Sequence, residues 1–182
     1  MALTTQQIQK AYIAFFNRPA DVSGLKNWLK YTGDDADILN AFSQSTEYTD
    51  LFTGKTSVEI VTIIYHNLFA RTPDAGGLQN WVNNLEAGTI TIGNIAYTML
   101  TSAGQGDIDT IAAKLAAAES FTTYLALHLD ASDAYETGGA PAGVIVRNWF
   151  SQIGESGSGQ QDALNYIGSA ANNLAALLGG GT

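Results

Sequence analysis

One stretch of the sequence occurs twice, and this duplication constrains the fold more than any other feature. Residues 16–28 read FNRPADVSGLKNW and residues 69–81 read FARTPDAGGLQNW, aligned without a gap. Seven aligned positions are identical, and in the first copy they are Phe16, Arg18, Asp21, Gly24, Leu25, Asn27 and Trp28. Tyr12 and Tyr65 extend the match upstream in the same register. So many identities in one register predict a duplicated supersecondary unit.

Each copy predicts a helix, a tight corner and a second helix. Pro19 and Pro73 end the first helix, because proline lacks an N–H group and clashes with the preceding helical turn. Asp21 and Asp74 stand where the next helix begins, so each carboxylate is expected to accept a hydrogen bond from a free N–H group of that turn. Replacing Asp74 by alanine should therefore reduce stability.

The other motif residues have a structural and a functional interpretation. Arg18 and Arg71 precede the aspartates by three residues and are expected to clamp the corner. Trp28 and Trp81 should occupy equivalent buried positions, so that Trp81→Ala costs roughly 3–5 kcal/mol. Glycine in the first turn of the second helix would let another backbone approach closely. Alternatively, the aspartate, asparagine and tryptophan of the motif form a ligand site.

These patterns predict an all-α fold, an irregular multi-helix bundle built on the duplicated helix–corner–helix unit. We expect about nine or ten helices from the apolar periodicity. The helical domain should cover residues 1–153, with repeats at about 5–54 and 56–125 and a terminal helical part.

The tail after residue 153 divides into three segments. Residues 154–159 indicate a flexible Gly/Ser joint, 160–178 an amphipathic helix, and 179–182 the start of a linker. The amphipathic helix either docks on the domain or associates with a partner.

Local signals place several helix boundaries. Thr4 with Gln7, and Thr56 with Glu59, have the spacing of capping boxes. A long alanine-rich helix should begin at Asp107, bend near residue 119 and end near residue 129. Residues 130–143 should form a loop, because they contain a Gly-Gly-Ala-Pro run.

Composition restricts the class of partner. The chain has 182 residues, 46% of them hydrophobic and only 14% charged, with a net charge of −9. This charge repels phosphate backbones, so nucleic acid is not an expected partner, and it disfavours binding to an anionic membrane. No apolar run approaches the ~20 residues that span a bilayer, so membrane insertion is not expected either. The absence of cysteine excludes disulfides and thiolate metal sites.

No pattern in the sequence supports catalysis. The two histidines, His66 and His128, are isolated within apolar helical runs. The nucleophile elbow, the zinc-protease motif and the phosphate-binding glycine loop are all missing. The calcium-binding EF-hand pattern is missing as well. We therefore expect a non-enzymatic chain with no catalytic residue and no metal ligand of its own.

Several phrases of the sequence together resemble a known family. They are the duplicated R-x-P-D-x-x-G-L-x-x-W corner, the helix phrase at residues 107–122, and the Ser-Thr-Glu-Tyr run at residues 45–48. They resemble a bacterial domain of unknown function that occurs in tandem in S-layer proteins and other large type I-secreted surface proteins. The resemblance covers roughly residues 5–125. The first copy departs from it, with Asn17 in place of the usual glycine and Pro19 directly after the arginine.

The resemblance implies a function at the bacterial surface. The N-terminal helical region of a Gram-negative S-layer protein holds the lattice to lipopolysaccharide, while the C-terminal part crystallises and carries the export signal. We therefore expect an extracellular anchoring module that binds the O-polysaccharide. The alternative is a protein–protein assembly module that contacts other S-layer protomers. Calcium is possible in the full-length protein.

Saccharide binding needs aromatic faces beside amide and carboxylate groups. The sequence places several such side chains where exposure is expected. The candidate saccharide-binding residues are Tyr31, Gln79, Asn83, Asn84, Asp133 and Tyr135.

Overall fold

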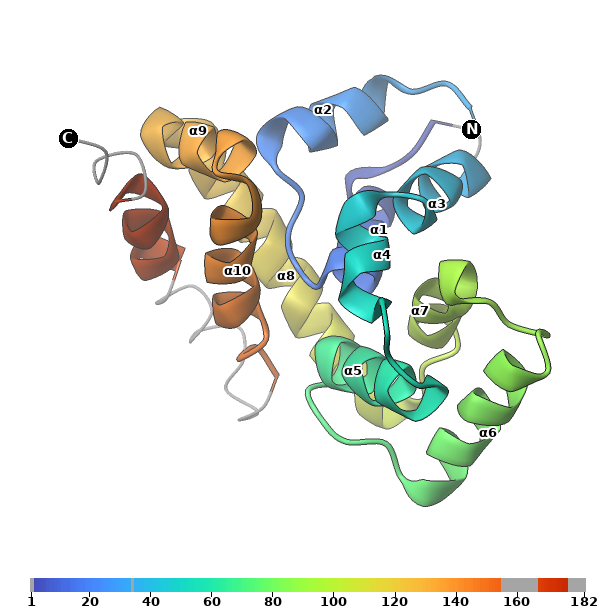
Figure 1. Ribbon diagram of the computed structural model, residues 1–182. Coiled ribbons are helices and arrows are strands. Elements are labelled where there is room, and N and C mark those ends of the chain that lie inside the picture. The colour runs from blue at the N-terminus through green and yellow to red at the C-terminus, as the bar shows by residue number, and fades with distance from the viewer. Residues whose placement is uncertain (1, 34, 155–166, 177–182) are drawn as a thin grey trace.

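The computed structural model describes residues 2–33, 35–154 and 167–176, and in this part of the chain the fold is all-α, with no strand (Figure 1). The predicted fold class is confirmed. The helices are α1 (Thr5–Phe16), α2 (Val22–Lys30), α3 (Asp35–Ser43), α4 (Thr46–Phe52), α5 (Ser57–Phe69), α6 (Ala75–Glu86), α7 (Ile92–Thr101), α8 (Gln105–Leu127), α9 (Leu129–Thr137) and α10 (Gly139–Phe150). A further helical segment covers residues 167–176.

The duplication is visible in the order of the helices. Helices α1 to α4 form the first repeat and α5 to α8 the second. The two corners match closely: α1 ends in a left-handed residue, Asn17 (φ 49°), and α5 ends in the aligned Ala70 (φ 52°). Asp21 Oδ1 accepts from Gly24 N at 2.6 Å, and Asp74 Oδ1 accepts from Gly77 N at 2.8 Å. Both predicted N-caps are therefore present.

The glycine of the motif has a different neighbour from the one expected. A Cβ atom on Gly77 would lie 2.7 Å from the Tyr65 hydroxyl oxygen, and one on Gly24 would collide with the Tyr12 hydroxyl. A tyrosine side chain approaches here, where another backbone was expected. In both copies, the motif glycine is therefore needed because the hydroxyl of the upstream tyrosine occupies the place of its Cβ atom.

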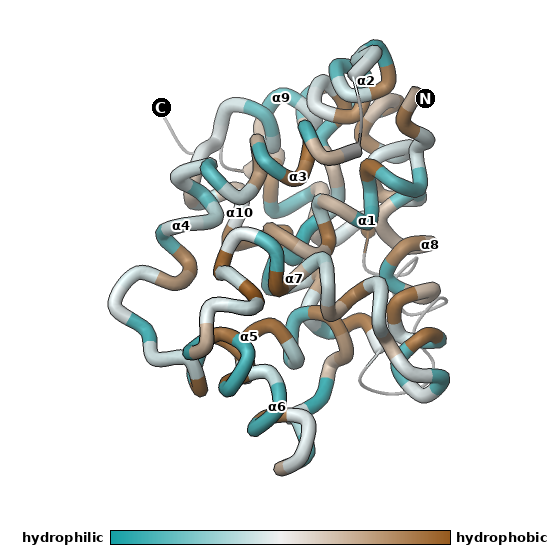
Figure 2. The backbone as a smooth tube through the Cα atoms, turned by 90° about the vertical axis from the view of Figure 1, so that its right-hand side faces the viewer, coloured by the Kyte–Doolittle hydropathy of each residue, from teal (hydrophilic) through white to brown (hydrophobic). Residues whose placement is uncertain are grey.

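Helix α1 lies at the centre of the bundle. It packs against α2, α3, α4, α5, α7 and α8, and Ile8, Ile13 and Phe15 are at most 1% exposed. Rings from three helices meet around it, with Phe15 and Tyr48 centroids 4.9 Å apart and Tyr12 and Phe42 centroids 4.8 Å apart. Both predicted capping boxes are present at the starts of α1 and α5. Brown and teal alternate along single helices in Figure 2, which reflects one-sided burial.

Helix α8 is a second organising element, and its helical run continues from Gln105 to Leu127 past residue 119, where a bend was predicted. Its Thr122 hydroxyl donates to Ala20 O at 2.7 Å and accepts from Gln9 Nε2 at 2.9 Å. Gln9 Oε1 accepts from Ala20 N at 2.9 Å. This buried network fixes the first corner against α1 and α8.

The predicted loop at residues 130–143 is wrong. This segment lies within α9 and α10, which are separated only by a reversal at Gly138 and Gly139 (φ +56°). Pro141 lies in the first turn of α10, where its missing N–H group would be unpaired in any case. The Gly-Gly-Ala-Pro run therefore reverses the chain between two helices, and only Gly138 lies outside both of them.

The tryptophans of the motif are less buried than expected. Trp28 and Trp81 both have intermediate exposure and pack against the edge of the core. They do occupy aligned positions on α2 and α6, so the expected equivalence holds while full burial does not. The reason is that α2 and α6 lie on the outside of the bundle (Figure 1).

The tail is described only in part. In the segment 167–176, Ile167, Ala170, Ala171 and Leu174 are buried in the common core. This much of the predicted amphipathic helix docks on the domain. The predicted joint after Gly154 and the predicted linker start at 179–182 lie outside the described residues. No described helix is both long and apolar enough to traverse a bilayer.

Candidate functional site

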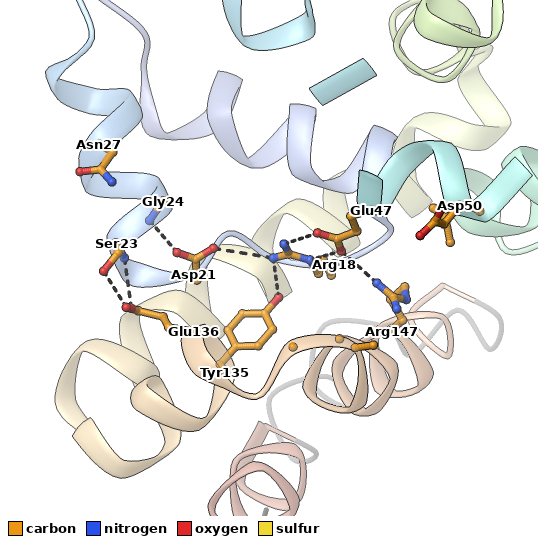
Figure 3. A pocket seen from close by; sticks show the side chains of 14 residues that line it. Arg18, Asp21, Ser23, Gly24, Asn27, Glu47, Asp50, Tyr135, Glu136 and Arg147 are labelled. Carbon is orange, nitrogen blue, oxygen red and sulfur yellow. Dashed lines mark hydrogen bonds and ion pairs between the residues drawn. The ribbon is translucent and has the colours of Figure 1, made fainter. Parts of the chain in front are cut away.

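An open cleft of about 710 Å³ lies beside the corner of the first repeat (Figure 3). Its walls come from that corner and from α2, α4, α9 and α10. The lining residues are Arg18, Asp21, Ser23, Gly24, Asn27, Glu47, Asp50, Leu51, Tyr135, Glu136, Gly139, Ala140, Gly143 and Arg147. A volume in this range is typical of small-molecule sites.

Arg18 organises one wall of the cleft. Its Nε and Nη2 atoms each donate to an oxygen of Glu47 at 2.8 Å, which is a bidentate pair. Its Nη1 atom donates to Pro19 O at 3.2 Å and to the Tyr135 hydroxyl at 3.0 Å, and it lies 3.8 Å from Asp21 Oδ2. The predicted clamp of the corner therefore exists, and it also reaches α4 and α9.

Tyr135 joins α9 to the corner. Its hydroxyl accepts from Arg18 and donates to Pro19 O at 2.8 Å. Burial raises the pKa of Tyr135 to about 12, although the nearby Arg18 charge opposes this, so the hydroxyl keeps its proton at neutral pH. The Arg18 guanidinium also lies 5.4 Å from the centroid of this ring, within the range of cation–π attraction.

Glu47 is shared by two arginines. Arg147 Nη1, from α10, donates to Glu47 Oε1 at 3.0 Å. Burial raises the pKa of Glu47, but hydrogen bonds and charges from Arg18 and Arg147 outweigh it and lower that pKa below its ordinary value. Gly143 gives Arg147 the room for this position, since a Cβ atom there would lie 3.1 Å from its Nη1. The three side chains form a rigid charged array.

The rim of the cleft holds both engaged and unengaged polar groups. Glu136 accepts from Ser23 N at 3.2 Å and from Ser23 Oγ at 2.7 Å. In the described part of the chain, the exposed side chains of Asn27 and Asp50 have no hydrogen-bond partner. The cleft therefore combines a fixed array with two groups that remain available to a ligand.

The predicted saccharide-binding residues are not gathered in one place. Gln79, Asn83 and Asn84 lie on α6, and Gln79 Nε2 donates to Asn83 Oδ1 at 2.7 Å. Tyr31 follows α2, and Asp133 lies on α9. Helices α6 and α9 lie at opposite ends of the molecule in both views (Figures 1 and 2).

Of these candidates only Tyr135 lines the cleft, and it is 7% exposed, so the expectation that it lies on the surface is wrong. Reasoning from the sequence missed Glu47, Asp50, Glu136 and Arg147. The signal for Glu47 was available, because it belongs to the Ser-Thr-Glu-Tyr run and a buried arginine needs a counter-charge.

The second corner is more open than the first. Arg71 Nε and Nη2 donate to Asp107 at 2.8 and 2.9 Å, and Nη1 donates to Thr72 O at 3.1 Å. The Arg71 side chain is 42% exposed, against 13% for Arg18. Within the described residues, no group of three or more His, Cys, Asp or Glu side chains is placed to hold a metal ion.

One comparison with known proteins gives a match. Residues 53–105 match the domain of unknown function DUF4214, so the chain contains such a domain. The matched region holds α5, α6 and α7 and includes the second copy of the corner. No curated protein and no solved structure matches the chain.

Proposed function

We propose that the chain is a non-catalytic saccharide-binding module and that the cleft beside the first corner is its binding site. The observation that carries this proposal is the lining of the cleft, which combines the paired Arg18–Glu47–Arg147 array with the side chains of Asn27 and Asp50. Sugar hydroxyls both donate and accept hydrogen bonds, so they need donors and acceptors in one place. The array and the two free side chains offer both.

The charged part of the lining is prearranged for binding. The array is already paired within the protein, so a sugar does not need to order it on binding. No lining residue is a histidine or a cysteine, and the hydroxyl of Ser23 is already held by Glu136 Oε2 at 2.7 Å, with no histidine beside it to act as a base. This arrangement supports binding without a chemical step.

Under this proposal the ligand is the O-polysaccharide of lipopolysaccharide. The module would then anchor an S-layer protein, or a similar type I-secreted protein, to the outside of a Gram-negative cell. A net charge of −9 disfavours contact with anionic core sugars and favours the outer chain. Each site would be weak, and many copies in a lattice would supply avidity. Bridging calcium is part of the same hypothesis.

A binding experiment on whole cells tests the proposal. The purified protein is added to cells that lack their own surface layer, with and without O-polysaccharide, in calcium and in chelator. We expect binding only where O-polysaccharide is present. Equal binding to both cell types, or to neither, would reject anchoring through O-polysaccharide.

The duplication provides a matched control for the site. Asn27→Ala removes a free amide from the cleft, whereas Asn80→Ala removes the aligned amide at the open second corner. Only Asn27→Ala should weaken binding. Equal losses in the two variants would place the site elsewhere.

One observation favours the alternative, an assembly module. Leu127 and Leu129, at the junction of α8 and α9, are 78% and 76% exposed. Exposed apolar side chains of this kind favour a protein partner. If the chain assembles through them, Leu127→Ser with Leu129→Ser should abolish self-association in analytical ultracentrifugation. An unchanged monomer mass for wild type and variant would count against assembly at this junction.

A further inference from the structure

The charges that line the cleft are unequal in number. Four carboxylates and two guanidinium groups face it, and they belong to Asp21, Glu47, Asp50, Glu136, Arg18 and Arg147. Both guanidinium groups are already bound to Glu47. The cleft therefore carries an excess of negative charge, which its own arginines do not neutralise.

Three of the four carboxylates have structural partners. Glu47 is held by the two arginines, and Asp21 caps α2 while lying 3.8 Å from Arg18 Nη1. Glu136 accepts from Ser23 and, at 3.3 Å, from Ser132 Oγ. These carboxylates serve the fold as well as the surface of the cleft.

Asp50 differs from the other three. It lies on the exposed side of α4, its carboxylate has no hydrogen bond or ion pair within the described residues, and it lines the cleft. Asn27, across on α2, is the other free polar side chain of the lining (Figure 3). A ligand that lies between α2 and α4 meets an acceptor of full negative charge on one side and a neutral amide on the other.

We infer that the cleft selects saccharides that carry a protonated amino group, with Asp50 as the specificity-determining residue. This inference rests on the proposed function. An ammonium group offers three donors and a positive charge, so it satisfies Asp50 and offsets the excess negative charge. A uronic acid or a phosphorylated sugar would be repelled. N-acetylation removes the positive charge of the amino group and should weaken binding.

The test compares two disaccharides that differ only in this group. Binding of the glucosamine disaccharide and of its fully N-acetylated form is measured by titration calorimetry at a pH where the free amine is protonated. The wild-type protein should bind the free amine roughly fivefold more tightly, as for a partly exposed ion pair. This preference should shrink as salt is added.

Two variants locate the effect. Asp50→Asn should abolish the preference, because the carboxylate that distinguishes an ammonium group from an acetamide is gone. Asp109→Asn, which makes the same charge change at an exposed position of α8 outside the cleft, should keep the preference. Thermal unfolding of both variants confirms that they fold as the wild type does.

The results separate the two hypotheses. A preference that survives Asp50→Asn, or no preference in the wild type, overturns the amino-sugar inference even if the protein binds O-polysaccharide on cells. Failure to bind the glucosamine disaccharide also overturns it. Loss of preference in both variants would indicate attraction to the overall charge of the protein, which overturns the role of Asp50. Saccharide anchoring itself stands or falls on the whole-cell experiment.

Discussion

The two corners have the same local structure and different surroundings. In each corner, the first helix ends in a residue with left-handed backbone conformation, and an aspartate caps the second helix. The arginine of each corner donates to the carbonyl of the next residue and to a carboxylate in the first turn of a later helix, which is α4 for Arg18 and α8 for Arg71. Helices α9 and α10 lie against the first corner, where they supply Tyr135 and Arg147. The two copies thus share the corner itself, whereas the cleft depends on α9 and α10, which pack beside the first copy.

The arginines should show the largest difference between the corners. Arg18→Ala leaves the partly exposed Glu47 with Arg147 alone and removes the donor to the buried Tyr135 hydroxyl, so we expect a loss of about 2–3 kcal/mol in the free energy of unfolding. Arg71→Ala removes an exposed pair and should cost about 1 kcal/mol or less. Urea unfolding measures both. Equal losses would show that the covering helices do not strengthen the first corner.

Acid should act on the first corner through Glu47. Its pKa is lowered in the folded protein, so its contribution to stability is complete above the unfolded pKa of about 4.3 and is lost as pH falls through the lower folded pKa. Glu47→Gln should flatten this acid limb of the stability curve. Arg147→Ala should move the limb to higher pH, because one counter-charge is gone. An acid limb identical in all three proteins would contradict this role.

The tryptophans should show a smaller difference. Because both are only partly buried, Trp28→Ala and Trp81→Ala should each cost about 2 kcal/mol, below the range for fully buried aromatic side chains. Trp28 also meets the rings of Phe42 at 5.7 Å and Tyr31 at 5.5 Å, edge to face. Its loss should therefore exceed that of Trp81 by up to about 1 kcal/mol. A larger loss for Trp81, measured by urea unfolding, would refute this ranking.

The residues in the left-handed conformation should show the smallest effect, and only in the second copy should glycine raise the stability. Ala70→Gly relieves a conformation that costs alanine about 1–2 kcal/mol, less the extra entropy of glycine, for a net gain of roughly 0.5–1 kcal/mol. Asn17 tolerates this conformation better, and its Nδ2 donates to Asn67 Oδ1 at 3.2 Å. Asn17→Gly should therefore give no gain, and a gain equal to that of Ala70→Gly would exclude a role for this bond.

Much of the scaffold followed from the sequence because its determinants are local. Proline, the capping aspartates and the threonine capping boxes act within a few residues of their own position, and the structure has each of them where the pattern placed it. The fixed register of the duplication likewise predicted two matching corners. The Gly-Gly-Ala-Pro run is the exception, because proline is compatible with the first turn of a helix and the pattern did not distinguish a brief reversal from a loop.

The cleft was decided by tertiary structure. Arg18, Glu47, Tyr135 and Arg147 come from four separate parts of the chain, and no periodicity relates them. The sequence determined that each corner would hold an arginine in need of a counter-charge. Only the packing of α9 and α10 decided which arginine became buried, because burial depends on what covers a side chain and the two motif copies are locally alike. For the same reason the sequence alone did not distinguish Asp50, free in a cleft, from the other acidic residues near helix starts and ends.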